Sequence, residues 1–153
     1  FRSGWMIGEE LVLYADLIKS GGFSCASIEY CAYRYRVNEG SLMNRFDLKL
    51  ERQQLLSWDM LCDVARGFFP SLTRDGGFAQ ARMRLAFLDK LITKGLERTS
   101  DYEQVSWWLK ENRSTVFGNS RFSLGRRASF EVFLVCPPLY RLLVKRRFSW
   151  QEK

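Results

Sequence analysis

Two adjacent glutamates near the start of the chain, Glu9 and Glu10, have the residue type and position for acid–base chemistry. They follow Gly8 and open a segment that ends at Gly21-Gly22, whose spacing of apolar residues predicts a short helix. A first helical turn favours carboxylates because the helix dipole and the unpaired N–H groups are positive there. On their position alone the two glutamates stabilise the helix start. Because the chain has no histidine, any acid–base chemistry must use carboxylates, Tyr, Lys or Cys.

An anion site is predicted after the next element. In residues 29–37, aromatic and other apolar side chains alternate with arginines, a period of two that predicts a strand. Arg36 lies at its end, and Gly40-Ser41 follow in a turn. A guanidinium and backbone N–H groups can converge on a phosphate at such a place. An arginine on a solvated strand face is the other interpretation.

Mainly helical elements are expected to position these residues. The apolar stripe of the first helix is predicted to consist of Ile7, Leu11, Tyr14 and Ile18. Helical periodicity predicts further segments at residues 47–66 and 78–94, a shorter one from Ser100, and two within 126–153. Ser100 and Glu103 fit a capping box, and loops are expected at residues 68–77 and 112–125.

The last segment, residues 126–153, interleaves apolar side chains with lysines and arginines. Pro137-Pro138 must break it, because proline lacks the N–H and clashes with the preceding turn, and we expect the second helix to begin at Pro138. This composition suits a helix that lies in a membrane interface. It equally suits a terminal helix that docks on the core and exposes its basic residues to water.

Composition limits the classes of function. The chain of 153 residues has 24 Lys and Arg against 17 Asp and Glu, a net charge of +7 that suits a partner with phosphates. It has no histidine, which excludes a histidine-based catalytic triad or a histidine-ligated metal within this chain. The four cysteines form no Cys-x-x-Cys pair and have apolar neighbours, so we expect buried free thiols in a reducing, cytosolic compartment.

A family resemblance joins the first of these motifs. Gly8-Glu9-Glu10, a helix, Gly21-Gly22, a strand ending in Tyr33-Arg34-Tyr35-Arg36, and Gly40-Ser41 together resemble the closing part of the catalytic domain of family 2 glycosyltransferases. These GT-A enzymes use nucleotide-diphospho-sugars to build bacterial capsule, exopolysaccharide and lipopolysaccharide chains. The likeness covers about residues 1–45, with a looser one at residues 137–141.

The resemblance implies an α+β fold that is mostly helical. Residues 1–45 would be the end of a GT-A catalytic domain, on its acceptor side, with its closing helix and strands. Residues 46–153 would be a helical C-terminal extension with a basic amphipathic tail. The chain begins with Phe1 and lacks the Asp-x-Asp metal motif of the family, so we expect it to begin partway through a larger protein.

The resemblance also implies roles for four residues. The triplet of the family is Gly-Glu-Asp, and its Asp is taken as the base that deprotonates the acceptor hydroxyl. Glu10 would be this base, one methylene longer, and Glu9 would support it or bind the acceptor. Arg36 and Ser41 would contact the donor diphosphate. A divalent metal, Mg²⁺ or Mn²⁺, is expected in the full-length enzyme, with its ligands outside this chain.

The implied function is sugar transfer from a nucleotide-diphospho-sugar to a glycan or lipid-linked acceptor in cell-surface polysaccharide biosynthesis. The enzyme would be cytoplasmic and peripheral on the inner face of the plasma membrane, with residues 126–150 contacting anionic lipid. The fragment alone is expected to be inactive, and no nucleic acid partner is expected. The alternative is a non-catalytic basic helical module that binds anionic membrane or nucleic acid.

Overall fold

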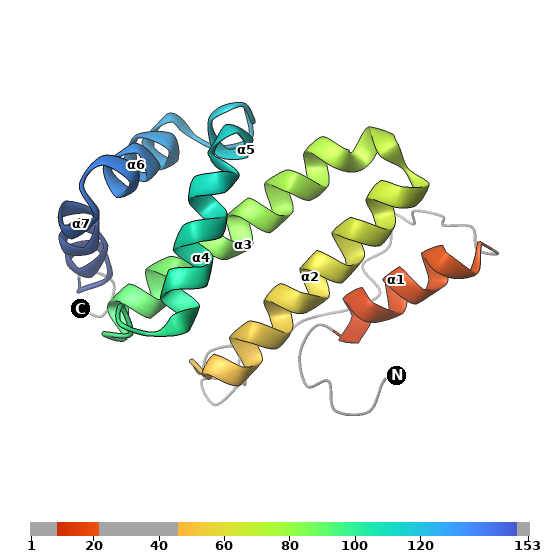
Figure 1. Cartoon of the computed structure of the whole chain (residues 1–153), viewed down its shortest axis with the longest axis horizontal. Coiled ribbons are helices and arrows are strands. Elements are labelled where there is room, and N and C mark those ends of the chain that lie inside the picture. The colour runs from red at the N-terminus through yellow and green to blue at the C-terminus, as the bar shows by residue number, and fades with distance from the viewer. Residues whose placement is uncertain (1–8, 22–45, 150–153) are drawn as a thin grey trace, which may run out of the picture. The chain divides into compact units, whose positions relative to one another are not determined.

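The computed structural model describes residues 9–21 and 46–149, and within them it contains seven α-helices, one short 3₁₀ helix and no strand (Figure 1). The chain divides into two compact units, residues 1–70 and residues 71–153. We call these the N-terminal unit and the C-terminal unit and describe each by itself.

The expected α+β class is therefore wrong, because every regular element that the structure describes is helical. The strand prediction rests on one alternating stretch, whereas the helices that the structure describes cover most of residues 46–149. The predicted strand at residues 29–37, with Arg36, lies outside the described residues, as does Ser41.

The described part of the N-terminal unit consists of two packed helices, α1 (Glu9–Ser20) and α2 (Leu48–Phe68) (Figure 1). Helix α1 ends as predicted before Gly21, which has a φ of 68° that glycine adopts at little cost. Helix α2 begins at the N-cap Asp47, whose carboxylate accepts hydrogen bonds from the N–H groups of Lys49 at 2.8 Å and Leu50 at 3.2 Å.

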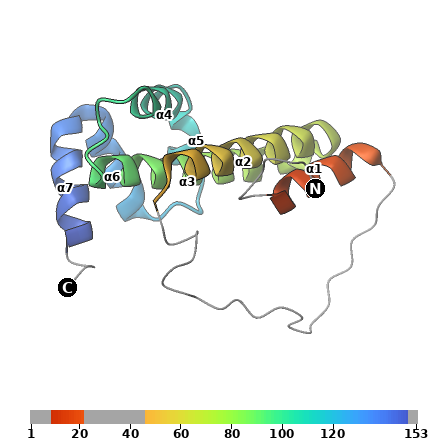
Figure 2. The same ribbon diagram turned by 90° about the horizontal axis from the view of Figure 1, so that it is seen from below.

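Helix α3 (Thr73–Thr93) is the central element of the C-terminal unit and packs against three others. The 3₁₀ helix η1 (Pro70–Leu72) precedes it. The partners of α3 are α4 (Ser100–Glu111), α5 (Arg113–Phe117) and α7 (Pro137–Ser149), and α6 (Leu124–Val135) packs against α7. Figures 1 and 2 both place α7 beside the C-terminal end of α3.

The predicted loop at residues 68–77 is partly wrong, because α3 already begins at Thr73 and runs through Gly76 and Gly77. Packing explains why glycines are found inside a helix that they weaken by propensity. A Cβ added at Gly77 would lie 3.2 Å from Cγ2 of Thr115, so the glycine lets α5 approach α3 closely. The same packing forms α5 within residues 112–125, where only a loop was expected.

Two predicted helix starts are shifted by one residue. Helix α4 uses Thr99 as its N-cap instead of Ser100, with the Thr99 hydroxyl accepting from the N–H of Tyr102 at 3.4 Å. The predicted break at Pro137-Pro138 is confirmed, but α7 begins at Pro137. Cys136 before it has an extended backbone, with φ −141° and ψ 76°.

The core of the C-terminal unit contains a buried carboxylate among aromatic rings. Oδ2 of Asp89 accepts a hydrogen bond from Nη1 of Arg126 at 2.8 Å, and Oδ1 accepts one from the Tyr140 hydroxyl at 2.5 Å. The ring of Phe133 contacts two other rings. Its centroid lies 5.8 Å from the centroid of the Phe130 ring and 5.4 Å from that of the Tyr140 ring. These contacts join α3, α6 and α7 around one charge.

We predict that replacing Tyr140 with phenylalanine destabilises the protein at neutral pH, measured by urea unfolding. The ring packing would remain, but Asp89 would lose a hydrogen bond of the charged type, worth about 1.5–3 kcal/mol. Burial, with a further contribution from the charge of Asp89, raises the pKa of Tyr140 well above its ordinary value.

The pH dependence of this difference provides a second check. Above the ordinary tyrosine pKa of about 10, the unfolded chain releases the phenolic proton that the folded chain retains. The free energy of unfolding of the natural protein therefore falls with rising pH, while Tyr140→Phe lacks this effect. The stability difference between the two should narrow above about pH 10, and a difference that stays constant there would contradict the assignment.

Candidate functional site

Glu10 lies in the first turn of α1, and its side chain is exposed. The helix start offers positive N–H groups, which favour a carboxylate at this place. An exposed carboxylate can reach a substrate hydroxyl, which a general base requires. The described geometry is thus compatible with both interpretations of Glu10, as a residue that stabilises the helix and as a base.

An exposed apolar face continues from Glu10 along α1. Leu13, Tyr14 and Leu17 follow Glu10 at spacings of three, four and seven residues, so the four side chains share one face. All three are exposed, Tyr14 by 52%. We call Glu10, Leu13, Tyr14 and Leu17 the α1 outer face. A carboxylate at the end of an apolar face is an arrangement that a substrate or a partner domain can cover.

This face corrects the apolar stripe predicted for α1. The residues that α1 buries are Val12 and Ala15, while Leu11 and Ile18 are half-buried and Tyr14 is exposed. Ile7 lies outside the described residues. The buried positions, Val12 and Ala15, thus each lie one residue further along the chain than the predicted Leu11 and Tyr14, so the helix presents a different face to its partner. In so short an apolar segment, the periodicity is compatible with burial of either face of the helix. Packing against α2 buries the face with the smaller side chains.

Of the other predicted site residues, Glu9 is the first residue of α1, and Arg36 and Ser41 lie outside the described residues. The grouping of Glu10 with Arg36 and Ser41 therefore stays a prediction. Within residues 9–21 and 46–149, no three Cys, Asp or Glu side chains are grouped so that they could hold a metal ion.

A second surface is formed by the outer face of α7. Leu139, Leu142 and Leu143 are spaced three and four residues apart and are all exposed, Leu142 by 64%. The opposite side of the helix buries Tyr140 and Val144 against the core. We call Leu139, Leu142 and Leu143 the α7 leucine face.

Basic residues lie beside this leucine face. Helix α7 carries Arg141, Lys145, Arg146 and Arg147 and no acidic residue. Nζ of Lys145 lies 2.6 Å from Oε1 of Glu97. Partial burial raises the pKa of Glu97, but the hydrogen bond from Lys145 and the charges of Lys145 and Arg141 outweigh this and lower the pKa overall. Apolar side chains flanked by cations are typical of helices that lie on anionic membranes.

The described helices include none whose length and apolar character would let it cross a bilayer. Cys62 is a buried free thiol, as predicted, whereas Cys136 is free but only half-buried.

Sequence reasoning missed Asp89, the buried charge in the middle of α3. A signal was present, since Asp89 lies directly between Leu88 and Lys90 in a run whose other members, Phe87, Leu91 and Ile92, are apolar and buried. An acidic residue in the buried turn of a helix needs a paired cation, and Arg126 is that partner.

Comparisons of the chain with models of protein families, with curated proteins and with solved structures found no match.

Proposed function

We propose that this chain forms the acceptor side of an enzyme that transfers a sugar from a nucleotide-diphospho-sugar to a glycan or a lipid-linked saccharide. The observation that carries the proposal is the exposed Glu10 carboxylate in the first turn of α1, at the end of the α1 outer face. The order of motifs around it, from Gly8-Glu9-Glu10 to Gly40-Ser41, supports the same assignment through its resemblance to family 2 glycosyltransferases.

In the proposed reaction, Glu10 accepts the proton of the acceptor hydroxyl as its oxygen forms a bond to the anomeric carbon. The bond from that carbon to the diphosphate breaks, and the nucleoside diphosphate leaves with the bonding electrons. Attack opposite the leaving group inverts the anomeric centre.

The remaining roles are assigned as follows. Glu9 supports the helix start or binds the acceptor, and Arg36 and Ser41 contact the diphosphate. In this proposal a divalent metal, Mg²⁺ or Mn²⁺, supplies further charge neutralisation of the diphosphate when bound. No group of side chains among residues 9–21 and 46–149 could hold such an ion, and the proposal assigns its ligands to the nucleotide-binding part of the enzyme.

The proposed place of action is the cytoplasmic side of the plasma membrane, with the tail of residues 126–150 contacting anionic lipid. The α7 leucine face and the cations beside it support this contact. The same observation favours a second candidate function, in which the chain is a non-catalytic module that binds anionic membranes. Both candidates use α7, but only the first requires Glu10.

We predict that Glu10→Gln lowers kcat by about 10²–10⁴-fold in the enzyme that carries this chain, because it removes the proton acceptor and keeps the side-chain size. The affinity for the donor should hardly change. Steady-state kinetics with the nucleotide-sugar and an acceptor saccharide measure both quantities.

Glu9→Gln is the matched control, since it removes a neighbouring carboxylate from the same helical turn. If Glu10 only stabilises the helix, both changes should cost about 0.3–1 kcal/mol of stability and leave turnover nearly intact. Glu10→Asp restores the residue found in the family and should retain activity. Unchanged kcat in Glu10→Gln would refute the assignment of Glu10 as the base.

For the membrane contact, we predict that the double change Leu142→Ser and Leu143→Ser lowers binding to vesicles that contain phosphatidylglycerol by at least about tenfold. Burying a leucine side chain contributes about 1.5–3 kcal/mol, and both residues are already exposed, so the fold should not suffer. Flotation of the protein with vesicles measures the binding.

Leu124→Ser serves as a control, because Leu124 is exposed at the start of α6 and lies outside the leucine face. Binding of the natural protein should weaken with added salt, since screening reduces the attraction of the cations to the anionic surface. Equal flotation of the double variant and the natural protein would contradict the membrane contact and indicate that α7 only docks on the core.

A further inference from the structure

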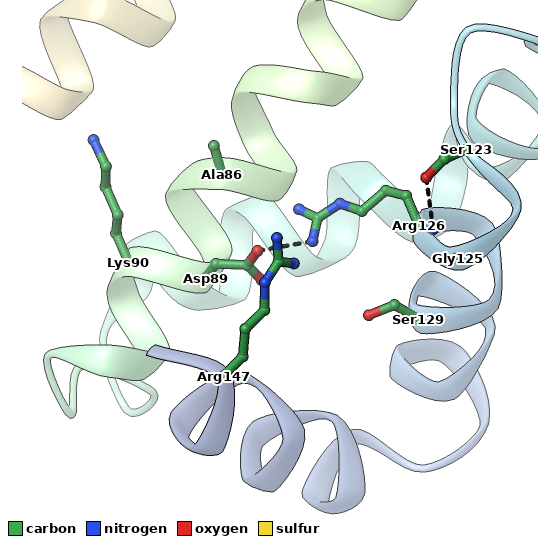
Figure 3. A pocket seen from close by; sticks show the side chains of 8 residues that line it. All are labelled: Ala86, Asp89, Lys90, Ser123, Gly125, Arg126, Ser129 and Arg147. Carbon is green, nitrogen blue, oxygen red and sulfur yellow. Dashed lines mark hydrogen bonds and ion pairs between the residues drawn. The ribbon is translucent and has the colours of Figure 1, made fainter. Parts of the chain in front are cut away.

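A pocket of about 720 Å³ lies in the C-terminal unit among α3, the start of α6 and α7 (Figure 3). Its polar side chains come from all three helices and are Asp89, Lys90, Ser123, Arg126, Ser129 and Arg147. Three of them are cations and one is an acid. Its volume is in the range of pockets that bind small molecules.

The single acid of the pocket is already neutralised. Both oxygens of Asp89 have a partner, Nη1 of Arg126 at 2.8 Å and the Tyr140 hydroxyl at 2.5 Å. The Asp89 side chain is 8% exposed and the Arg126 side chain 22%. Arg147 therefore contributes positive charge that no other acid of the pocket balances.

Two donors of the pocket are available for a ligand. Within the described part of the chain, neither the Ser129 hydroxyl nor the Arg147 guanidinium makes a hydrogen bond or ion pair. In Figure 3 the Arg147 side chain extends from α7 toward Asp89, and the Ser129 hydroxyl is directed into the space between α6 and α7. Arg147 belongs to a helix that the contact between Tyr140 and Asp89 holds in place.

We propose that this pocket binds a phosphate group, with Arg147 and Ser129 as its donors. A guanidinium presents paired N–H donors whose geometry matches two phosphate oxygens, and a hydroxyl can donate to a third. The phosphate belongs either to a free phosphorylated molecule or to the headgroup of an anionic lipid.

The proposal is independent of sugar transfer. Glu10 lies in the N-terminal unit, whereas every residue of the pocket lies in the C-terminal unit. Glu10→Gln should therefore leave phosphate binding unchanged, so failure of the Glu10 assignment and failure of phosphate binding are distinguishable.

The test is a calorimetric titration of the whole chain with inorganic pyrophosphate in a chloride buffer. We expect saturable binding to one site, weakened about tenfold or more by Arg147→Gln, which removes the paired donors. Ser129→Ala should weaken binding by a smaller factor. Arg146→Gln is the matched control, because it makes the same charge change on the adjacent residue of α7, which does not line the pocket.

A second arm distinguishes the two sources of the phosphate. Binding to phosphatidylcholine vesicles is compared with and without phosphatidylglycerol, in the presence of pyrophosphate as competitor. Binding of pyrophosphate in solution that is sensitive to Arg147→Gln indicates a free phosphorylated ligand. Binding to the phosphatidylglycerol vesicles that Arg147→Gln weakens more than Arg146→Gln, with little affinity for pyrophosphate, indicates a lipid headgroup.

Two results would overturn the proposal. One is the absence of saturable pyrophosphate binding together with equal vesicle binding by Arg147→Gln and Arg146→Gln. The other is equal weakening of pyrophosphate binding by these two variants, which would assign the attraction to net charge alone. Circular dichroism of both variants verifies the helical fold, and Arg147 is exposed and unpaired within the described residues, so its replacement should not disturb it.

Discussion

The ion pair between Asp89 and Arg126 is the interaction on which the C-terminal unit depends. A buried carboxylate is tolerated only when its charge is paired and its oxygens accept hydrogen bonds. Arg126 and Tyr140 satisfy the two oxygens of Asp89 from different helices, α6 and α7. Removing one partner would leave a buried charge incompletely paired, and the stacked rings of Phe130 and Phe133 next to it offer no replacement donor.

The same constraint determines which sides of α7 remain outside the core. Because Tyr140 must reach Asp89, the face of α7 that carries Tyr140 and Val144 is turned inward. The helical period then turns Leu139, Leu142 and Leu143 to the solvent and brings Arg147 to the pocket. Both candidate binding features of this unit thus follow from one buried contact.

Sequence reasoning predicted most helices of the described chain, because apolar periodicity, glycines and prolines mark them locally. It failed where tertiary contacts decide. Helix α3 runs through Gly77 because close packing with Thr115 of α5 outweighs the low helix propensity of glycine. The burial of Val12 and Ala15 in place of Tyr14 depends on the partner helix α2, which no local pattern specifies.

In the candidate sites, too, local features could be predicted and features that depend on contacts across the fold could not. The position of Glu10 at a helix start was predicted from local sequence and is confirmed, whereas its role as a base comes from the family resemblance and stays a prediction. The α1 outer face and the pocket were not predicted, because they combine residues whose grouping depends on helix rotation and on contacts across the fold. Asp89 could have been found as a charge within a buried apolar run, but its partner Arg126 lies 37 residues further along the chain.

The division of the chain after Pro70 has a consequence for evolution. The buried ion pair, the aromatic core around it, the leucine face and the pocket all lie within residues 71–153. Recombination of the gene near the codon of Pro70 would transfer all of these features together. The same basic helical module would in this way be joined to a different N-terminal unit without loss of its core.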